Sequence, residues 1–99
     1  MATWYSAKLL FEATVDGVRE PNAVCEESIR VLLSETEGSA RAKAEGLGKA
    51  GEHEYLNESG QTVRWVFISV LEVQELDETE LTDGTEVFST LSRSAEKGQ

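Results

Sequence analysis

The chain has 99 residues, enough for a single domain with one modest core. Its 19 acidic and 9 basic side chains give a net charge of −10, which argues against nucleic acid and anionic membranes as partners, because both are bound through Lys and Arg. The single cysteine, Cys25, can form no internal disulfide, and the N-terminus has no signal-peptide pattern. No apolar run reaches the roughly 18 residues of a transmembrane helix. These features predict a cytoplasmic protein.

The first part of the chain predicts two strands joined by a turn. Residues from Thr3 to Val15 alternate in the manner of a half-buried strand, and Asp16-Gly17 supplies a turn after it. A second strand is expected over Val24 to Leu33. The inward residues of the first strand would be Tyr5, Ala7, Leu9, Phe11, Ala13 and Val15. Those of the second strand would be Ile29, Val31 and Leu33.

A helix is expected after the second strand. Ser34 with Glu37 three residues later fits a capping box, and Thr36 is the competing N-cap. Small residues at helical spacing allow a helix to approach a sheet closely, and they form the stripe Ala40, Ala44 and Leu47. Glycine accepts the left-handed conformation that ends helices, which places the C-terminus of this helix among Gly46, Gly48 and Gly51.

The longest apolar run, Thr62 to Leu76, predicts a central strand. A short strand over Glu52 to Leu56 and a hairpin loop over residues 57–60 precede it. Both faces of the run are apolar between Trp65 and Leu71, so we expect both to be covered. Strict alternation would put Val63, Trp65, Phe67, Leu71 and Val73 on one face. It would put Val66, Ile68 and Val70 on the other.

The end of the chain predicts an acidic loop or a single helical turn over residues 77–84, a last strand over Thr85 to Leu91 and a flexible tail over residues 93–99. The order strand, strand, helix, strand, strand, strand indicates an α+β fold. We expect one domain, residues 1–92, in which one helix packs on one face of a mainly antiparallel sheet of about five strands. One helix leaves the second face bare, so either the sheet coils upon itself or a second copy covers that face; a homodimer is the expected solution.

Six stretches in this order resemble a bacterial family known only as a domain of unknown function, numbered 4288. The stretches are Trp4 to Phe11, Glu26 to Ile29, Ala40 to Gly48, Tyr55 to Asn57, Val63 to Phe67 and Gly84 to Ser89. Because the family has no assigned activity, the resemblance implies a small bacterial domain and no chemistry.

Two groups of residues invite a catalytic or metal-binding interpretation. Cys25 and His53 are a nucleophile and a base, but they fall in separate elements and no third residue would orient them. In the sequence Glu52-His53-Glu54, neighbours on a strand point to opposite faces, so the two carboxylates would converge and the imidazole would diverge. One histidine is a weak metal signal, and we predict no metal, no cofactor and no catalytic residue.

The acidic loop is a candidate binding surface, because no Lys or Arg occurs between Arg64 and Arg93. A calcium loop beginning at Asp77 would need an oxygen ligand at its fifth position, which is Leu81. The predicted binding residues are Asp77, Glu78, Glu80 and Asp83 of the loop, with Trp4, Lys8 and Leu10 on the less covered face. We interpret the chain as a protein-binding module, an adaptor or an immunity-type inhibitor of a basic partner. The alternative is a small enzyme or ligand-binding protein with a pocket between sheet and helix or at a dimer seam.

Overall fold

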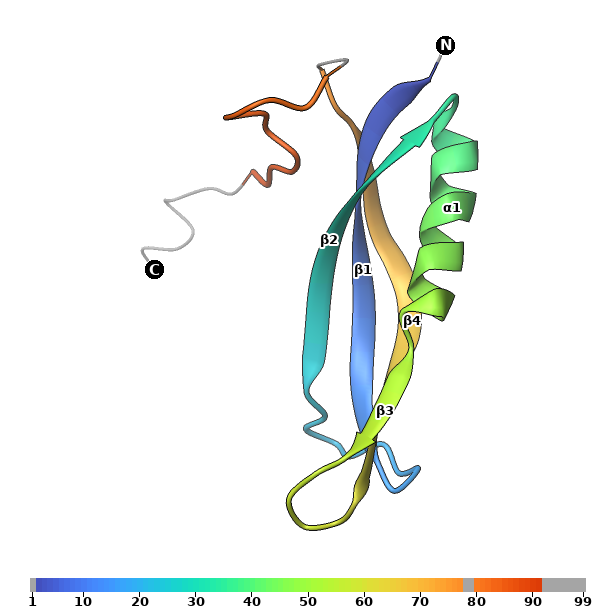
Figure 1. Ribbon diagram of the computed structural model, residues 1–99, viewed down its shortest axis with the longest axis vertical. Helices are drawn as coiled ribbons and strands as arrows, with labels where there is room; N and C mark the ends of the chain where they lie inside the picture. Colours follow the sequence, from blue (N-terminus) through green and yellow to red (C-terminus); the bar gives the residue numbers. More distant parts are fainter. Residues whose placement is uncertain (1, 78–79, 92–99) are drawn as a thin grey trace.

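The computed structural model, which describes residues 2–77 and 80–91, has an α+β fold in which one helix packs on an antiparallel sheet (Figure 1). The four strands lie in the order β2-β1-β4-β3. The elements are β1 (Thr3–Val15), β2 (Cys25–Ser34), α1 (Glu37–Ala50), β3 (His53–Leu56) and β4 (Thr62–Glu75). The predicted α+β fold class is therefore confirmed, with four strands rather than about five. The strand flanked on both sides along its length is β1, whereas β4, which we predicted to be central, pairs with β3 only near its start.

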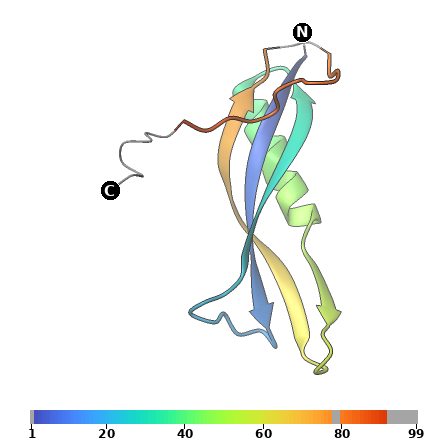
Figure 2. The ribbon, with the colours of Figure 1, turned by 90° about the vertical axis from the view of Figure 1, so that its left-hand side faces the viewer.

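The predicted last strand, residues 85–91, is wrong: this segment adopts no regular secondary structure. It crosses the sheet on the side away from α1 (Figure 2). It contacts side chains of β1 and β4 instead of pairing with a strand. The Phe88 ring lies 4.5 Å from Lys8 Nζ, and the Ser89 carbonyl accepts a hydrogen bond from Gln74 Nε2 at 2.9 Å. A segment that crosses a face meets no free strand edge, so its alternating sequence finds no ladder to join. The predicted tail, residues 93–99, lies outside the described residues.

The core lies between α1 and the sheet. Its buried residues are Tyr5, Ala7, Leu9, Phe11, Leu32, Ala40 and Ala44. Full burial of side chains such as Leu9 and Phe11 stabilises the fold by about 1.5–3 kcal/mol each.

The helix begins at the competing N-cap. The Thr36 hydroxyl, rather than that of Ser34, accepts the N–H of Ser39 at 3.0 Å. The stripe that faces the sheet continues from Ala44 to Gly48, whereas the predicted member Leu47 is 37% exposed. Because Gly48 follows Ala44 by four residues, it lies on the side of the helix that comes closest to the sheet.

The inward face predicted for β2 is the wrong one. Ile29, Val31 and Leu33 are exposed, whereas Leu32 and Ser34 are buried. The reason is the register with β1, which places Tyr5 opposite Leu32. Residues opposite each other share a face, so the inward Tyr5 fixes the side chain of Leu32 inward and those of its neighbours outward.

The faces of β4 depart from strict alternation because the strand contains two irregularities. The register with β1 shifts between Leu10 and Phe11 and again between Lys8 and Leu9. Each shift adds one residue to β4 and exchanges its two faces. Val70 therefore packs against the core, and the two extra residues are exposed; these are Ile68 and Leu71.

Candidate functional site

The sheet face opposite α1, called here the outer face, gathers three of the predicted binding residues. Trp4, Lys8 and Leu10 occupy even-numbered positions on β1 and so share one face, and all three are half-buried. The register places the first two opposite Leu33 and Ile29 of β2. The outer face therefore combines exposed aliphatic side chains with one lysine.

The segment of residues 80–91, called here the crossing segment, covers part of the outer face over β1 and β4 (Figure 2). On the same face, between Trp4 and Lys8, the Ser6 hydroxyl is fully buried and has no hydrogen-bond partner among the described residues. Leu76 is also buried, and its N–H donates to the Trp4 carbonyl at 2.9 Å. The aliphatic row on β2 stays exposed, with Ile29 at 46%, Val31 at 39% and Leu33 at 42%.

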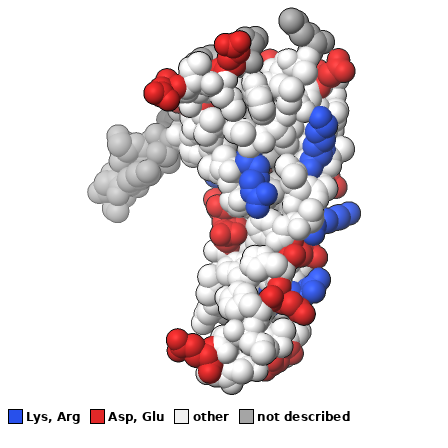
Figure 3. All heavy atoms as spheres, viewed as in Figure 1, with Lys and Arg blue, Asp and Glu red and all other residues white. Residues whose placement is uncertain are grey.

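The acidic residues that follow the C-terminal end of β4 are exposed. Asp77, Glu80 and Asp83 are exposed, and the predicted binding residue Glu78 lies outside the described residues. Asp77 and Glu86 line one small hollow with Phe88. In the view of Figure 3, acidic side chains lie at both ends of the molecule, and acidic and basic side chains both occur along its middle. Three of the basic residues, Arg41, Lys43 and Lys49, belong to α1.

A second group at the outer face contains Glu12, which sequence reasoning did not single out. This carboxylate is 7% exposed and forms an ion pair with Arg19, and it accepts a hydrogen bond from Cys25 Sγ at 3.7 Å. The three residues line an open hollow of about 340 Å³. The sequence signal for this group was an acidic residue, Glu12, within a largely apolar strand. No spacing rule links this residue to Arg19 in the following loop. Cys25 and His53 lie on strands at opposite edges of the sheet, so they form no nucleophile–base pair.

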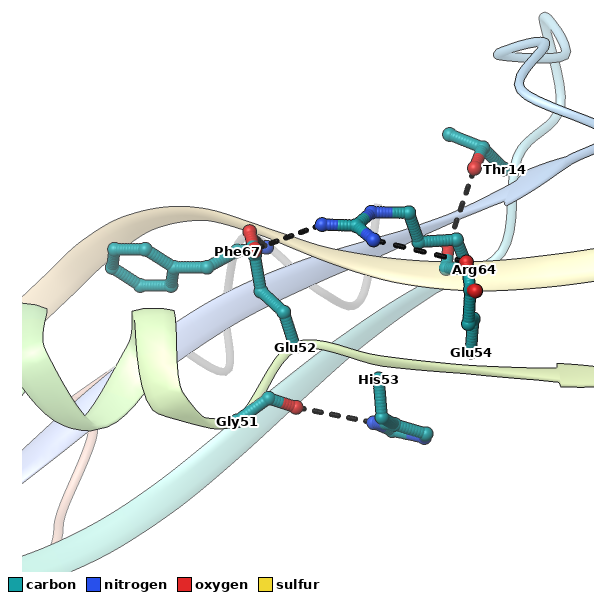
Figure 4. A network of polar contacts seen from close by, with 7 residues as sticks. All are labelled: Thr14, Gly51, Glu52, His53, Glu54, Arg64 and Phe67. Atoms are coloured by element: carbon teal, nitrogen blue, oxygen red, sulfur yellow. Dashed lines mark hydrogen bonds and ion pairs between the residues drawn. The ribbon is translucent and has the colours of Figure 1, made fainter.

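The convergence predicted for Glu52 and Glu54 is confirmed, and their common partner is Arg64 (Figure 4). Arg64 Nη2 lies 3.3 Å from Glu52 Oε1, and Nη1 lies 3.7 Å from Glu54 Oε2. Glu52 Oε2 also accepts the backbone N–H of Phe67 at 2.9 Å. The His53 ring turns away and lies 3.1 Å from the Gly51 carbonyl. This network ties the end of α1 to β4 and occupies the carboxylates that a metal would need.

A further hollow, of about 430 Å³, lies between α1 and the part of β4 that β3 does not reach. Its lining combines Arg41, Glu45 and Lys49 of the helix with residues 67–70 of β4. This hollow is one of two between sheet and helix, where the alternative interpretation expected a pocket; the other, of about 440 Å³, lies between β2 and α1. Within residues 2–77 and 80–91, no three His, Cys, Asp or Glu side chains are grouped to hold a metal ion. The helix that the structure describes is too short and too polar to cross a membrane.

These features define a small α+β domain in which one helix covers one face of a curled antiparallel sheet and the other face is covered only in part. The family described as a domain of unknown function (DUF4288) matches residues 4–89, and the chain belongs to this family. The resemblance found in the sequence is thereby confirmed. No curated protein and no solved structure matches the chain.

Proposed function

We propose that the chain is a cytoplasmic protein-binding module that docks a basic protein partner on its outer face, as an adaptor or an immunity-type inhibitor would. The observation that supports this function most directly is the exposed aliphatic row of β2, formed by Ile29, Val31 and Leu33. The row lies beside the half-buried Trp4 and Leu10 of β1. Exposed apolar side chains that adjoin one another on a sheet are typical of interaction surfaces.

The charges beside the row favour a basic partner. Glu27 faces Leu10, Glu72 faces Lys8, and the crossing segment adds further carboxylates. Lys8 is already engaged, because its ammonium group lies 3.5 Å from Glu27 Oε1 and above the Phe88 ring. An acidic rim accelerates association with a basic partner and makes the rate depend on salt.

The test compares captured proteins among variants of the full chain. One variant changes Ile29, Val31 and Leu33 to Thr, and a second changes Asp77, Glu78, Glu80 and Asp83 to Asn, Gln, Gln and Asn. The control changes Leu56, which is 69% exposed on β3, to Thr. The partner should be basic, should be kept by the control and should be lost from the first variant.

Purified partner is then measured against the second variant at low and high salt. Association should slow by about tenfold when the four acids are neutralised, and it should slow with salt for the unmodified chain. Equal rates throughout would leave the acidic residues as a solubility feature, and retention of the partner by the threonine variant would exclude the outer face.

A further inference from the structure

The two edges of the sheet differ in how open they are to another strand. β4 pairs with β3 only from Thr62 to Trp65, but its remaining edge contains both register shifts. Its Phe67 N–H is already bound by the Glu52 carboxylate. Bulges and charged caps of this kind discourage pairing with another chain.

The edge of β2 has none of these obstacles over most of its length. All ten residues of β2 pair with β1 in one continuous register, and the described residues place no strand on the other side. Ile29 and Val31 add exposed apolar side chains to this regular edge. A long, regular edge strand presents a row of unpaired backbone groups that pairs readily with a strand of another chain.

The direction of the backbone groups on β2 follows from one hydrogen bond. The Val24 carbonyl accepts the N–H of Ala13 on β1 at 2.9 Å, so alternate residues from Val24 onward point their backbone groups toward β1. The residues between them point outward, and they are Cys25, Glu27, Ile29, Val31 and Leu33. The Leu33 carbonyl accordingly accepts a hydrogen bond from Lys43 Nζ of α1 at 2.5 Å, which closes the edge at that point.

We propose that two copies of the chain pair along the open part of this edge, with antiparallel β2 strands related by a two-fold axis at Ser28. This inference concerns the edge of β2 and does not depend on the basic partner proposed above. The pairing places Cys25 opposite Val31 and Glu27 opposite Ile29 of the second copy. These outward residues exchange backbone hydrogen bonds, and Leu33 stays outside the paired region.

Two features select the axis at Ser28: the charges of Glu26 and Arg30, and the hydrogen bond that Lys43 donates to the Leu33 carbonyl. This axis puts each Glu26 opposite Arg30 of the second copy, and neither side chain has an ion-pair partner among the described residues. An axis at Arg30 would oppose two guanidinium groups. Axes at Ile29 and Val31 would place Leu33, whose carbonyl is already bound, inside the ladder. Opposite charges facing each other across a ladder are favourable, whereas like charges are not.

The surroundings of β2 leave room for this arrangement. The first part of β2 lies away from α1 (Figure 1), and the helix approaches the strand near Leu33 through Lys43. The crossing segment contacts Lys8 and Gln74, which belong to β1 and β4. A two-fold axis perpendicular to the sheet keeps the outer faces of both copies on the same side.

Disulfide trapping tests the register. In a Cys25→Ser background, Ser28→Cys places two thiols directly opposite each other at a non-hydrogen-bonded pair, where Cα atoms are about 4.5 Å apart. Ile29→Cys in the same background is the control, because it is 46% exposed but would face Glu27 of the second copy. The half-buried position 28 should cross-link at least about tenfold faster than position 29 under mild oxidation. Faster cross-linking at position 29 would indicate random collision and overturn the register.

Sedimentation of the full chain tests the dimer itself. The net charge of −10 opposes association, so the measurement is made at about 0.15 M salt and above, where the screening length is about 8 Å or less. Arg30→Glu should weaken the dimer by about tenfold, and the combined Glu26→Arg and Arg30→Glu exchange should restore it. A monomer at high micromolar concentration, or failure of the exchange to restore a folded variant, would overturn the proposal.

Discussion

The two faces of the sheet are built from the same strands but are covered differently. On β1, Leu9 and Phe11 are buried against the helix, while Lys8 and Leu10 of the outer face remain half-buried. Aliphatic content does not separate the two faces, since Leu33 is 42% exposed and its neighbour Leu32 is buried. Burial depends on what covers a face, and a single helix of 14 residues covers only one. Substitutions on the helix-covered face should therefore change stability, and those on the outer face should change binding.

The largest contrast is expected from the same truncation on each face. Phe67 packs against Phe11 with ring centroids 5.8 Å apart, beneath Gly48 of α1. Phe67→Ala should lower the free energy of unfolding by about 3–5 kcal/mol, because removal of the ring leaves a cavity beneath the helix that cannot collapse fully. Phe88→Ala, on the crossing segment, should cost about 1 kcal/mol or less. Urea denaturation measures both, and similar losses would show that the two faces are equally important for stability.

Adjacent leucines on β2 give a second contrast. Leu32→Ala should cost about 2–4 kcal/mol because this side chain belongs to the core. Leu33→Ala should cost less than about 1 kcal/mol, because this side chain already lies partly in water. Chemical denaturation of the two variants at the same protein concentration provides the comparison. A larger loss for Leu33 would mean that the register of β2 is shifted by one residue.

This pair of leucines also marks where prediction from the sequence succeeded and where it ended. The bounds of β1 and the place of the helix could be predicted, because alternation and capping residues are local signals. The faces of β2 could not, since Val31 and Leu33 are as apolar as Leu32 and the choice is made by the register with Tyr5. The strand predicted over residues 85–91 failed for a similar reason, because a strand requires a free edge as well as an alternating sequence.

The candidate site was predictable to the extent that it depends on a single strand. Trp4, Lys8 and Leu10 share the outer face because they share a parity on β1. The pairing of Glu12 with Arg19 depends on how the loop after β1 returns to the sheet, and no local pattern encodes that path. The two extra residues of β4 likewise depend on its register with β1, so strict alternation misplaced Val70 and Leu71.

Two glycines of α1 test how closely the helix approaches its face of the sheet. A Cβ atom added at Gly48 would lie 2.3 Å from the Phe67 ring, while one added at Gly46 meets nothing within 4 Å. Gly48→Ala should cost about 1–3 kcal/mol, because overpacking outweighs the gain in helix propensity. Gly46→Ala should stabilise the protein by about 0.5–1 kcal/mol. Thermal denaturation of both variants decides the matter, and stabilisation by both would mean that the helix stands further from the sheet.

The smallest expected effect is a change in stability at alkaline pH that depends on Tyr5, a buried residue of the helix-covered face. Burial raises the pKa of Tyr5, and the carboxylates of Glu75 and Glu37 raise it further. Because the folded-state pKa lies above the ordinary value of about 10, the neutral phenol favours the folded protein. Its contribution is complete below that ordinary value and is lost as the pH rises through the folded-state pKa. Tyr5→Phe should therefore remove the part of the decline of stability above about pH 10 that Tyr5 causes. Glu75→Gln should make that decline smaller without abolishing it, because Glu75 is only one cause of the raised pKa. Denaturation midpoints between about pH 8 and pH 11 measure the decline, and an unchanged slope in Tyr5→Phe would assign it to other groups.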